Sequence, residues 1–110
     1  MKIRGKVIAI TGGGQGLGRA MAVYLAAQGA KLALIDLDQD QLNETCRLTA
    51  EAGSEAASFV CNVTNEAQVE ETFSAISQQL GGLHGLINNA GILRDGLMVK
   101  AKDGDITKLS

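Results

Sequence analysis

Short apolar runs alternate with amphipathic stretches along most of the chain. The apolar runs are rich in Val, Ile and Leu, without strict alternation of apolar and polar positions, and they occupy residues 6–11, 31–36, 56–61 and 83–88. Runs of this kind are typical of strands that are covered on both faces, as in a parallel sheet. We therefore expect four strands.

Each interval between the strands has apolar residues at helical spacing and a glycine where the helix should end. The three glycines are Gly29, Gly53 and Gly81. Two intervals also begin with a pair that matches the capping box, Asp38 with Gln41 and Asn65 with Gln68. The resulting order, βαβαβαβ, predicts parallel pairing with right-handed crossovers and helices on both faces of the sheet.

The fold class that we expect is therefore α/β, a Rossmann-type doubly wound parallel sheet. After residue 99 the chain becomes polar, so the regular pattern stops after about four strands. An end at this point would leave the fourth strand, residues 83–88, at an edge of the sheet.

Length, charge and cysteine usage narrow the function classes. The 110 residues suffice for one small domain, and the net charge of -2 without a basic run argues against a nucleic-acid partner. No apolar stretch approaches the roughly 20 residues of a membrane span, and no signal-peptide core is present, so we expect no membrane partner and a cytoplasmic location. Cys46 and Cys61 are too few and too far apart for a disulfide scaffold or a paired zinc site, and we interpret both as core residues.

Candidate chemistry begins with the sequence Thr-Gly-Gly-Gly-Gln-Gly-Leu-Gly at residues 11–18, between the first strand and the first helix. Glycines in such a turn let the backbone approach a diphosphate, and the N–H groups at the start of the following helix attract its charge. We expect the cofactor contacts of this loop at Gly12, Gly14, Gln15, Gly16 and Leu17.

The spacing of the glycines leaves the nucleotide open. Gly13 and Gly18 are spaced as in the phosphate loop of triphosphatases, but Arg19 and Ala20 stand where that loop needs Lys and a magnesium-binding hydroxyl. Phosphoryl transfer is therefore excluded. The strict Gly-x-Gly-x-x-Gly pattern is absent and Gly-x-Gly-x-Gly occurs twice, which keeps a methyltransferase that binds a nucleoside as an alternative.

Asp36 narrows the choice of nucleotide. It ends the second strand, where a carboxylate can accept hydrogen bonds from both ribose hydroxyls of an adenosine. A 2′-phosphate at that place would meet a negative charge, and neither Gln15 nor Leu37 supplies a cation to reverse this. The residues predict NAD as the cofactor, with NADP less favoured.

Polar and small residues also follow the third and fourth strands, at the carboxyl side where ligands of open α/β sheets bind. After the third strand, Asn62 and Val63 are candidate contacts, with the Asn62 side chain pairing with an adenine edge. After the fourth, Asn89, Ala90 and Gly91 would present amides and a wall without side chains to a ribose.

Together these residues resemble the short-chain dehydrogenase/reductase family, over residues 1 to about 98. Residues 11–18 match its cofactor loop, Asp36 its NAD-selecting acid, and Asn-Asn-Ala-Gly at residues 88–91 its fourth-strand motif, the most specific of the three. Asn62 departs from the pattern, because the family usually has an Asp there that contacts the adenine amine. An amide oxygen can accept the same hydrogen bond.

Residues 88–95 are also similar to the 3-oxoacyl-carrier-protein reductases within the family. Those enzymes commonly favour NADP, so Asp36 argues against a simple transfer of their substrate to this chain.

The resemblance implies hydride transfer between a nicotinamide and an alcohol or ketone, with a catalytic Ser, a Tyr and a Lys four residues after that Tyr. The sequence does not supply this set: Tyr24 lies in the first predicted helix and is followed at the fourth position by Gln28. His84 starts the fourth strand, at the end away from the cofactor. We therefore interpret residues 1–110 as the N-terminal, cofactor-binding part of a single dinucleotide-binding domain. Its catalytic C-terminal part is absent, so the chain alone is predicted to be inactive.

The expected partners are a small-molecule alcohol or ketone for the parent enzyme, and either a second copy of the protein or the missing C-terminal part. The alternatives are an NAD-binding sensor without catalysis, the methyltransferase, and a structural fragment that associates with a second half. NAD titration, protection by S-adenosylmethionine and co-purification of a C-terminal piece would distinguish them.

Overall fold

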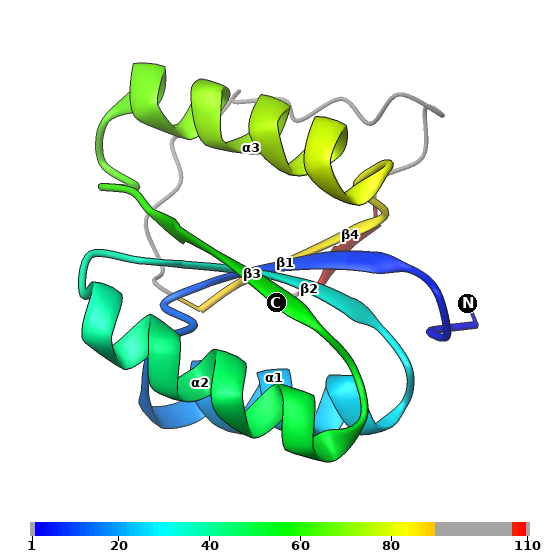
Figure 1. The fold of residues 1–110 in the computed structure, drawn as a ribbon. Helices are drawn as coiled ribbons and strands as arrows, with labels where there is room; N and C mark the ends of the chain where they lie inside the picture. The colour runs from blue at the N-terminus through cyan, green and yellow to red at the C-terminus, as the bar shows by residue number, and fades with distance from the viewer. Residues whose placement is uncertain (1, 90–106, 110) are drawn as a thin grey trace.

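The computed structural model describes residues 2–89 and 107–109. A central sheet lies between two layers of helices (Figure 1). The elements are β1 (Val7–Thr11), α1 (Gly16–Ala27), β2 (Lys31–Asp36), α2 (Gln39–Ala52), β3 (Ala56–Val60), α3 (Glu66–Leu80), β4 (Gly85–Asn88) and β5 (Thr107–Leu109). The Rossmann-type α/β fold class predicted from the sequence is confirmed.

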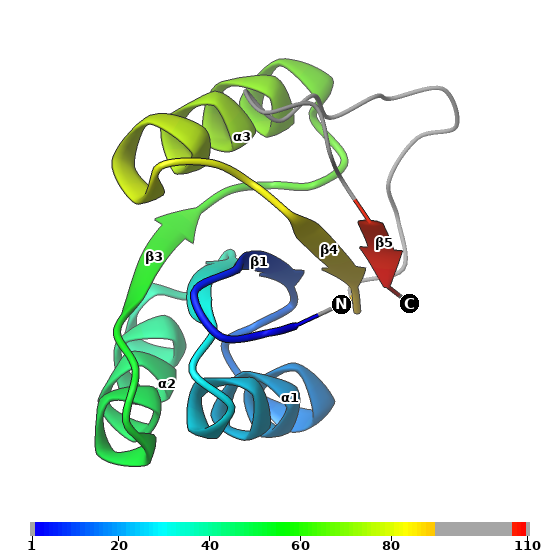
Figure 2. The ribbon, with the colours of Figure 1, turned by 90° about the vertical axis from the view of Figure 1, so that its right-hand side faces the viewer.

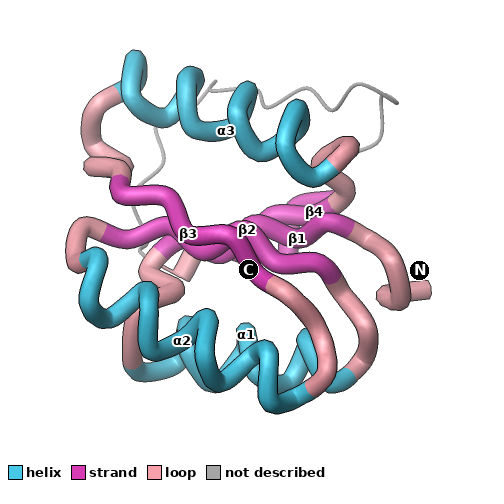
Figure 3. The backbone as a smooth tube through the Cα atoms, viewed as in Figure 1, coloured by secondary structure: helices cyan, strands magenta, loops and turns pink. Residues whose placement is uncertain are grey.

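All strand pairs are parallel, and the strand order is β3-β2-β1-β4-β5. The chain builds the sheet outward from β1 to β3, then crosses over to the other side of β1 with β4. Helices α1 and α2 cover one face and α3 covers the other, as Figures 1 and 3 show. The reversal places a topological switch point between β1 and β4, which is where open sheets of this type bind ligands.

The two faces of β1 belong to two separate hydrophobic clusters. Val7 and Ala9 pack with the cluster under α3, whereas Ile8 and Ile10 pack with the cluster under α1 and α2. Each of these side chains is at most 1% exposed. A run of apolar residues without alternation is what a strand covered on both faces requires, and β1 and β2 meet that prediction.

Strand β3 is the exception to the prediction of full burial. Its residues are half-buried up to Val60, which is 53% exposed. The cause is its place in the sheet, because β3 pairs with β2 on one side and lies at the edge.

The expectation that β4 would be an edge strand is wrong. The short strand β5 pairs with β4, with Gly85 opposite Thr107 and Ile87 opposite Leu109. Figure 2 shows β5 beside β4 on the side away from β3. The sheet therefore continues by one strand beyond the four that the apolar runs indicate.

The predicted ends of α2 and α3 are confirmed, whereas their capping boxes are formed on one side only. Asp38 and Asn65 are the N-caps, and their side chains accept hydrogen bonds from backbone N–H groups of the first turn. In a complete capping box the two glutamines would accept from the N–H of the N-cap residue. Here Oε1 of Gln41 accepts from Arg19 instead, and Oε1 of Gln68 accepts from the N–H of Asn62. Gly53 and Gly81 end the helices in the left-handed conformation, with φ of 116° and 84°.

The cysteines differ in burial. Cys61 is buried in the cluster under α3, and Cys46 is half-buried against the cluster under α1 and α2, so neither lies fully at the surface. Within the part of the chain that the structure describes, no group of three or more His, Cys, Asp or Glu side chains could hold a metal ion. None of the helices in that part has the length and apolar character to cross a membrane.

Candidate functional site

The carboxyl ends of β1, β2 and β4 converge on the glycine loop at residues 12–15. Gly12 has a φ of 68° and Gly16 a φ of 60°, a conformation that residues with a side chain rarely adopt. The N–H of Gly13 donates to the carbonyl of Ile35 over 3.1 Å, which fastens the loop to the end of β2. A Cβ at Gly18 would overlap with the carbonyl oxygen of Gly12. Glycine is therefore required both for the turn and for the close approach of the first turn of α1.

The N-terminus of α1 lacks the side-chain cap that the other two helices have. Its N-cap residue, Gln15, makes no capping hydrogen bond and its first turn has no acidic residue. By contrast, α2 and α3 each combine a capping side chain with an acid, Asp40 and Glu66, in the first turn. The first N–H groups of a helix have no intrahelical partner, and an anion can satisfy them. Gln15, Gly16 and Leu17 are exposed at this point, as a binding site for an anion requires.

Asp36 lies half-buried at the end of β2, beside the glycine loop. Its Oδ2 accepts from the N–H of Gly14 over 2.9 Å, and its Oδ1 accepts from the N–H of Leu37 over 2.7 Å. An ionised carboxylate has about four acceptor sites, so both oxygens retain capacity for a second donor. The neighbouring Leu37 side chain is 67% exposed and uncharged. The predicted ribose acceptor is thus held in place and still able to accept.

Asn62 follows β3 and is committed to its own turn. Its Oδ1 accepts from both the N–H and the hydroxyl of Thr64, at 3.0 and 2.7 Å. An amide oxygen has two lone pairs, so these contacts use the acceptor that was expected to receive the adenine amine. Val63 is half-buried and packs against the cluster under α3.

Asn89 connects β4 to the glycine loop. Its Nδ2 donates to the carbonyl oxygen of Gly12 over 3.2 Å, and the hydroxyl of Thr11 donates to Oδ1 of Asn88 over 3.0 Å. The end of β4 therefore fixes the start of the loop on the side opposite Asp36. The other two predicted contacts of this motif, Ala90 and Gly91, lie outside the described residues.

The two side chains that were weighed for proton transfer lie away from this region. Tyr24 projects from α1 and is 64% exposed. His84 precedes β4 at the amino end of the sheet, where its Nδ1 accepts from the N–H of Val7 over 2.9 Å. Both side chains therefore lie apart from the glycine loop and Asp36.

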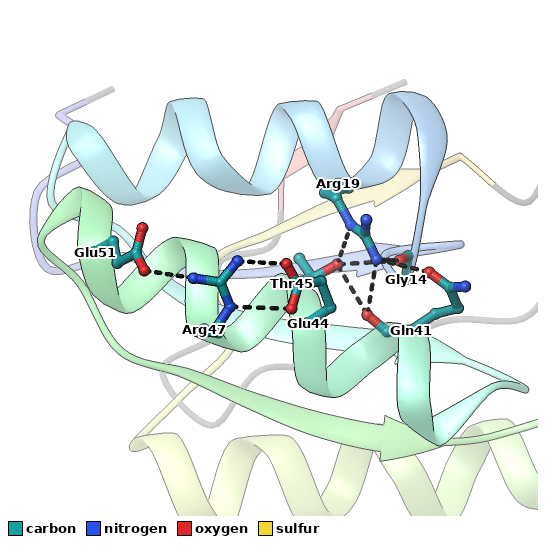
Figure 4. Close-up of polar contacts among 7 residues, drawn as sticks. All are labelled: Gly14, Arg19, Gln41, Glu44, Thr45, Arg47 and Glu51. Carbon is teal, nitrogen blue, oxygen red and sulfur yellow. Dashed lines mark hydrogen bonds and ion pairs between the residues drawn. The ribbon is translucent and has the colours of Figure 1, made fainter.

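A polar network behind the loop was missed by the sequence analysis. The guanidinium of Arg19, in the first turn of α1, donates to Gly14, Gln41 and Thr45 (Figure 4). Figure 4 also shows Arg47 on the exposed side of α2, paired with two glutamates. The sequence holds one signal for the network, since Arg19 is the only charged residue between Lys6 and Lys31.

The glycine loop, Asp36 and the end of β4 thus meet at the switch point of the sheet, and comparison with known proteins identifies the family. A family model described as short chain dehydrogenase matches residues 6–110. This chain belongs to the short-chain dehydrogenase/reductase family. The resemblance stated from the glycine loop, Asp36 and the Asn-Asn-Ala-Gly motif is therefore confirmed.

Members of this oxidoreductase family that are similar to the chain act on different substrates. The 2-(S)-hydroxypropyl-CoM dehydrogenase 3 of Xanthobacter autotrophicus is 42% identical over 91 residues, which cover 83% of this chain and 36% of that protein. A 3-oxoacyl-[acyl-carrier-protein] reductase of Thermotoga maritima is 33% identical over 105 residues, covering 96% of this chain and 43% of that protein. The chain thus spans less than half the length of these short-chain dehydrogenase/reductase relatives.

A solved structure of the family shows the same fold. The crystal structure of NAD+-bound xylitol dehydrogenase superposes with a TM-score of 0.79 and 38% sequence identity, covering 84% of this chain and 35% of that one. That protein is bound to NAD+ in its crystal structure.

Proposed function

We propose that residues 1–110 are the cofactor-binding part of an NAD-dependent oxidoreductase of the short-chain dehydrogenase/reductase type. The observation that carries the proposal is the placement of the Asp36 carboxylate, held by Gly14 with acceptor capacity to spare, beside the uncapped start of α1. One group binds a ribose diol and the other binds a diphosphate, and a dinucleotide contains both.

Each part of the loop has a distinct task in this proposal. The N–H groups at the start of α1, near Gly16 and Leu17, would bind the diphosphate, because α1 supplies no side chain of its own to satisfy them. Gly12 and Gly14 keep the backbone close to the ligand, and the exposed Gln15 borders it. When bound, NAD(H) supplies the hydride exchange with an alcohol or ketone carbon.

The preference for NAD over NADP follows from charge. A 2′-phosphate would be placed against the Asp36 carboxylate, and the neighbouring Leu37 offers no cation to offset the repulsion. Arg19 lies behind the loop, but its guanidinium is already bonded to the loop and to α2.

The remaining proposed contacts lie after β3 and β4. With its oxygen used by Thr64, Asn62 would face the adenine through its Nδ2 donor, beside Val63. Asn89 would act by holding Gly12, with Ala90 and Gly91 next to it in the sequence as a ribose contact. The two roles differ, since the first residue meets the base and the second supports the loop.

Catalysis would require residues beyond these. We propose that the chain alone has no turnover, and that a further part of the protein supplies the proton donor and the pocket for an alcohol or ketone. A 3-oxoacyl-carrier-protein reductase-like enzyme is the alternative. A cytoplasmic location and assembly with further copies belong to the same proposal. An assay of the mass-verified chain checks it, and NAD-dependent turnover without an added polypeptide would contradict it.

Calorimetric titration of the chain with NAD+ and NADP+ tests the cofactor proposal. We expect saturable binding of NAD+, weaker binding of NADP+, and a loss of NAD+ affinity of about tenfold or more in Asp36→Ala, as expected for hydrogen bonds to a charged group. The matched control is Asp40→Asn, which removes an exposed carboxylate in the first turn of α2 without touching the loop. Equal loss in both variants, or no binding by the unaltered chain, would refute the proposal.

A second candidate, association with a separate C-terminal part, is favoured by an apolar hollow of about 330 Å³ between α1 and β4. Its lining is Ala20, Met21, Tyr24, Leu25 and Ile87. An apolar surface of this kind is suited to cover by another helix. Co-expression with a C-terminal piece would give a stable complex that Met21→Glu disrupts, and a monomeric chain in the presence of that piece would contradict this candidate.

A further inference from the structure

Arg19 joins the first turn of α1 to the first two turns of α2. Its Nη2 donates to the carbonyl oxygen of Gly14 over 2.6 Å and to the carbonyl oxygen and Oε1 of Gln41 over 3.2 and 2.7 Å. Its Nε donates to the hydroxyl of Thr45 over 3.0 Å. Figure 4 shows these contacts converging on one guanidinium. The side chain is half-buried, and Thr45 is fully buried.

Gly14 is held at both of its backbone polar groups. Its N–H donates to Oδ2 of Asp36, and its carbonyl oxygen accepts from Arg19 and, over 3.1 Å, from the hydroxyl of Thr45. Glycine has the greatest backbone freedom of any residue, so a single anchor would leave the direction of the other group unset. The carbonyl anchor therefore contributes to the placement of the N–H that binds the carboxylate.

The packing around Gly14 makes this connection tight. A Cβ at Gly14 would lie 2.7 Å from Oδ2 of Asp36 and 3.0 Å from Cβ of Gln41. The loop thus fits between the carboxylate and α2 with no room for a side chain. A displacement of Gly14 would be passed directly to Asp36.

The chemistry of Arg19 differs from that of Arg47, the other arginine in Figure 4. Arg47 makes exposed ion pairs with Glu44 and Glu51 on its own helix. The acceptors of Arg19 are neutral: two carbonyl oxygens, an amide oxygen and a hydroxyl. A planar guanidinium can donate hydrogen bonds to these acceptors from two of its nitrogens at once. A lysine ammonium has a single nitrogen and cannot.

We propose that Arg19 is a positioning residue for adenosine binding, acting through Gly14 to place the Asp36 carboxylate without touching the nucleotide. This inference rests on the proposed function, because it assigns the ribose contact to Asp36. Arg19 would set the affinity for any ligand that carries the adenosine ribose diol. It would leave the binding of ligands without that diol unchanged.

The test compares Arg19→Met, Arg19→Lys and the control Arg47→Met by calorimetric titration with NAD+, AMP and 2′-deoxy-AMP. We expect Arg19→Met to lower the affinity for NAD+ and AMP about tenfold, the equivalent of one well-placed hydrogen bond. The affinity for 2′-deoxy-AMP should change much less. Arg19→Lys keeps the positive charge but loses the planar guanidinium, so its affinities for NAD+ and AMP should be close to those of Arg19→Met. Arg47→Met should bind like the unaltered chain.

A double-mutant cycle separates positioning from general damage to the fold. In an Asp36→Ala background, Arg19→Met should lower the affinity for NAD+ by less than about a further twofold, because the carboxylate through which Arg19 acts is already absent. An equal loss in both backgrounds, or full recovery in Arg19→Lys, would overturn the inference while leaving the proposed function intact. If Asp36→Ala binds NAD+ as the unaltered chain does, the proposed function fails and the inference fails with it.

A ligand-free readout covers the case in which Arg19→Met lowers affinity by partial unfolding. The backbone amide of Gly14 should shift in a ¹H–¹⁵N correlation spectrum and lose hydrogen-exchange protection, while the amides of Ile8 and Ile10 in β1 stay protected. An unchanged Gly14 amide would overturn the inference. Loss of protection at Ile8 and Ile10 as well would assign Arg19 to the stability of the whole sheet and would also overturn it.

Discussion

The N–H of Gly14 donates to the carboxylate of Asp36 over 2.9 Å, and the two residues are 22 positions apart in the sequence. This bond joins the glycine loop to the end of β2. The conformation of the loop and the placement of the acid are consequently parts of one structure. A change at Gly14 should therefore alter how Asp36 selects the nucleotide.

Reversal of the cofactor preference is the first prediction. Replacing Asp36 by Ser and Leu37 by Arg removes the carboxylate and adds an exposed cation at the point where a 2′-phosphate would lie. We expect the double variant to bind NADP+ more tightly than NAD+ in calorimetric titrations. Leu37→Arg alone, which keeps the acid, should shift the preference less. A double variant that still favours NAD+ would show that the 2′ position lies elsewhere.

The close approach at Gly18 gives a prediction for stability. In Gly18→Ala the new Cβ would overlap with the backbone carbonyl of Gly12, which no rotamer change can relieve, so we expect a loss of about 2 kcal/mol or more in the free energy of unfolding. Gly16→Ala meets open space and bears only the strain of its φ of 60°, about 1 kcal/mol. Urea unfolding of both variants checks the order, and a larger loss in Gly16→Ala would contradict it.

The local hydrogen bonds of Asn62 predict a gain of affinity. Asn62→Asp supplies a carboxylate with more acceptor sites, so the side chain can keep both contacts with Thr64 and accept from the adenine amine as well. The variant loses the Nδ2 donor, but a hydrogen bond to a charged carboxylate is stronger than the neutral contact that it replaces, so we expect NAD+ to bind about three- to tenfold more tightly. Nicotinamide hypoxanthine dinucleotide lacks the amine and should show no gain. A gain with both dinucleotides would rule out this contact.

Burial raises the pKa of the Cys46 thiol, which gives a pH dependence. The folded state favours the neutral thiol, so between the unfolded and folded pKa values it binds more protons than the unfolded state does. The contribution of Cys46 is therefore fully present below the usual thiol pKa of about 8.5 and is lost as the pH rises through the folded value. Cys46→Ala should flatten the fall in the free energy of unfolding at alkaline pH. An identical pH profile in the variant would contradict the assignment.

The pattern of the sequence predicted the fold well because the elements depend on local periodicity. The first four strands and three helices are apolar runs and amphipathic stretches with glycine ends, and each is present within a few residues of its expected bounds. Strand β5 was missed because the three residues Thr107–Leu109 lie in a polar stretch and are too short to show a period. Its pairing with β4 is a long-range event that no local pattern encodes.

The site was predicted less completely, for the same reason. Asp36 and the glycine loop are recognisable since their spacing along the chain reflects their chemistry. The bonds of Arg19 arise only once α1 and α2 pack side by side, and they take Gln41 away from its expected capping role. The saturation of Asn62 by Thr64 depends on the turn after β3, whose geometry the residue types alone do not specify.

The exclusively parallel pairing bears on how the chain folds. Among the described strands, no two neighbours are joined by a hairpin. The pair β1 and β4 brings Ile8 opposite Gly85 from nearly the full described length of the chain. Rates of folding fall as contacting residues become more distant in sequence. We therefore expect this sheet to form slowly for a chain of its size. During synthesis, β1 and β2 would emerge early and keep one apolar edge unpaired until β4 leaves the ribosome. An unpaired apolar edge of this kind exposes a folding intermediate to aggregation.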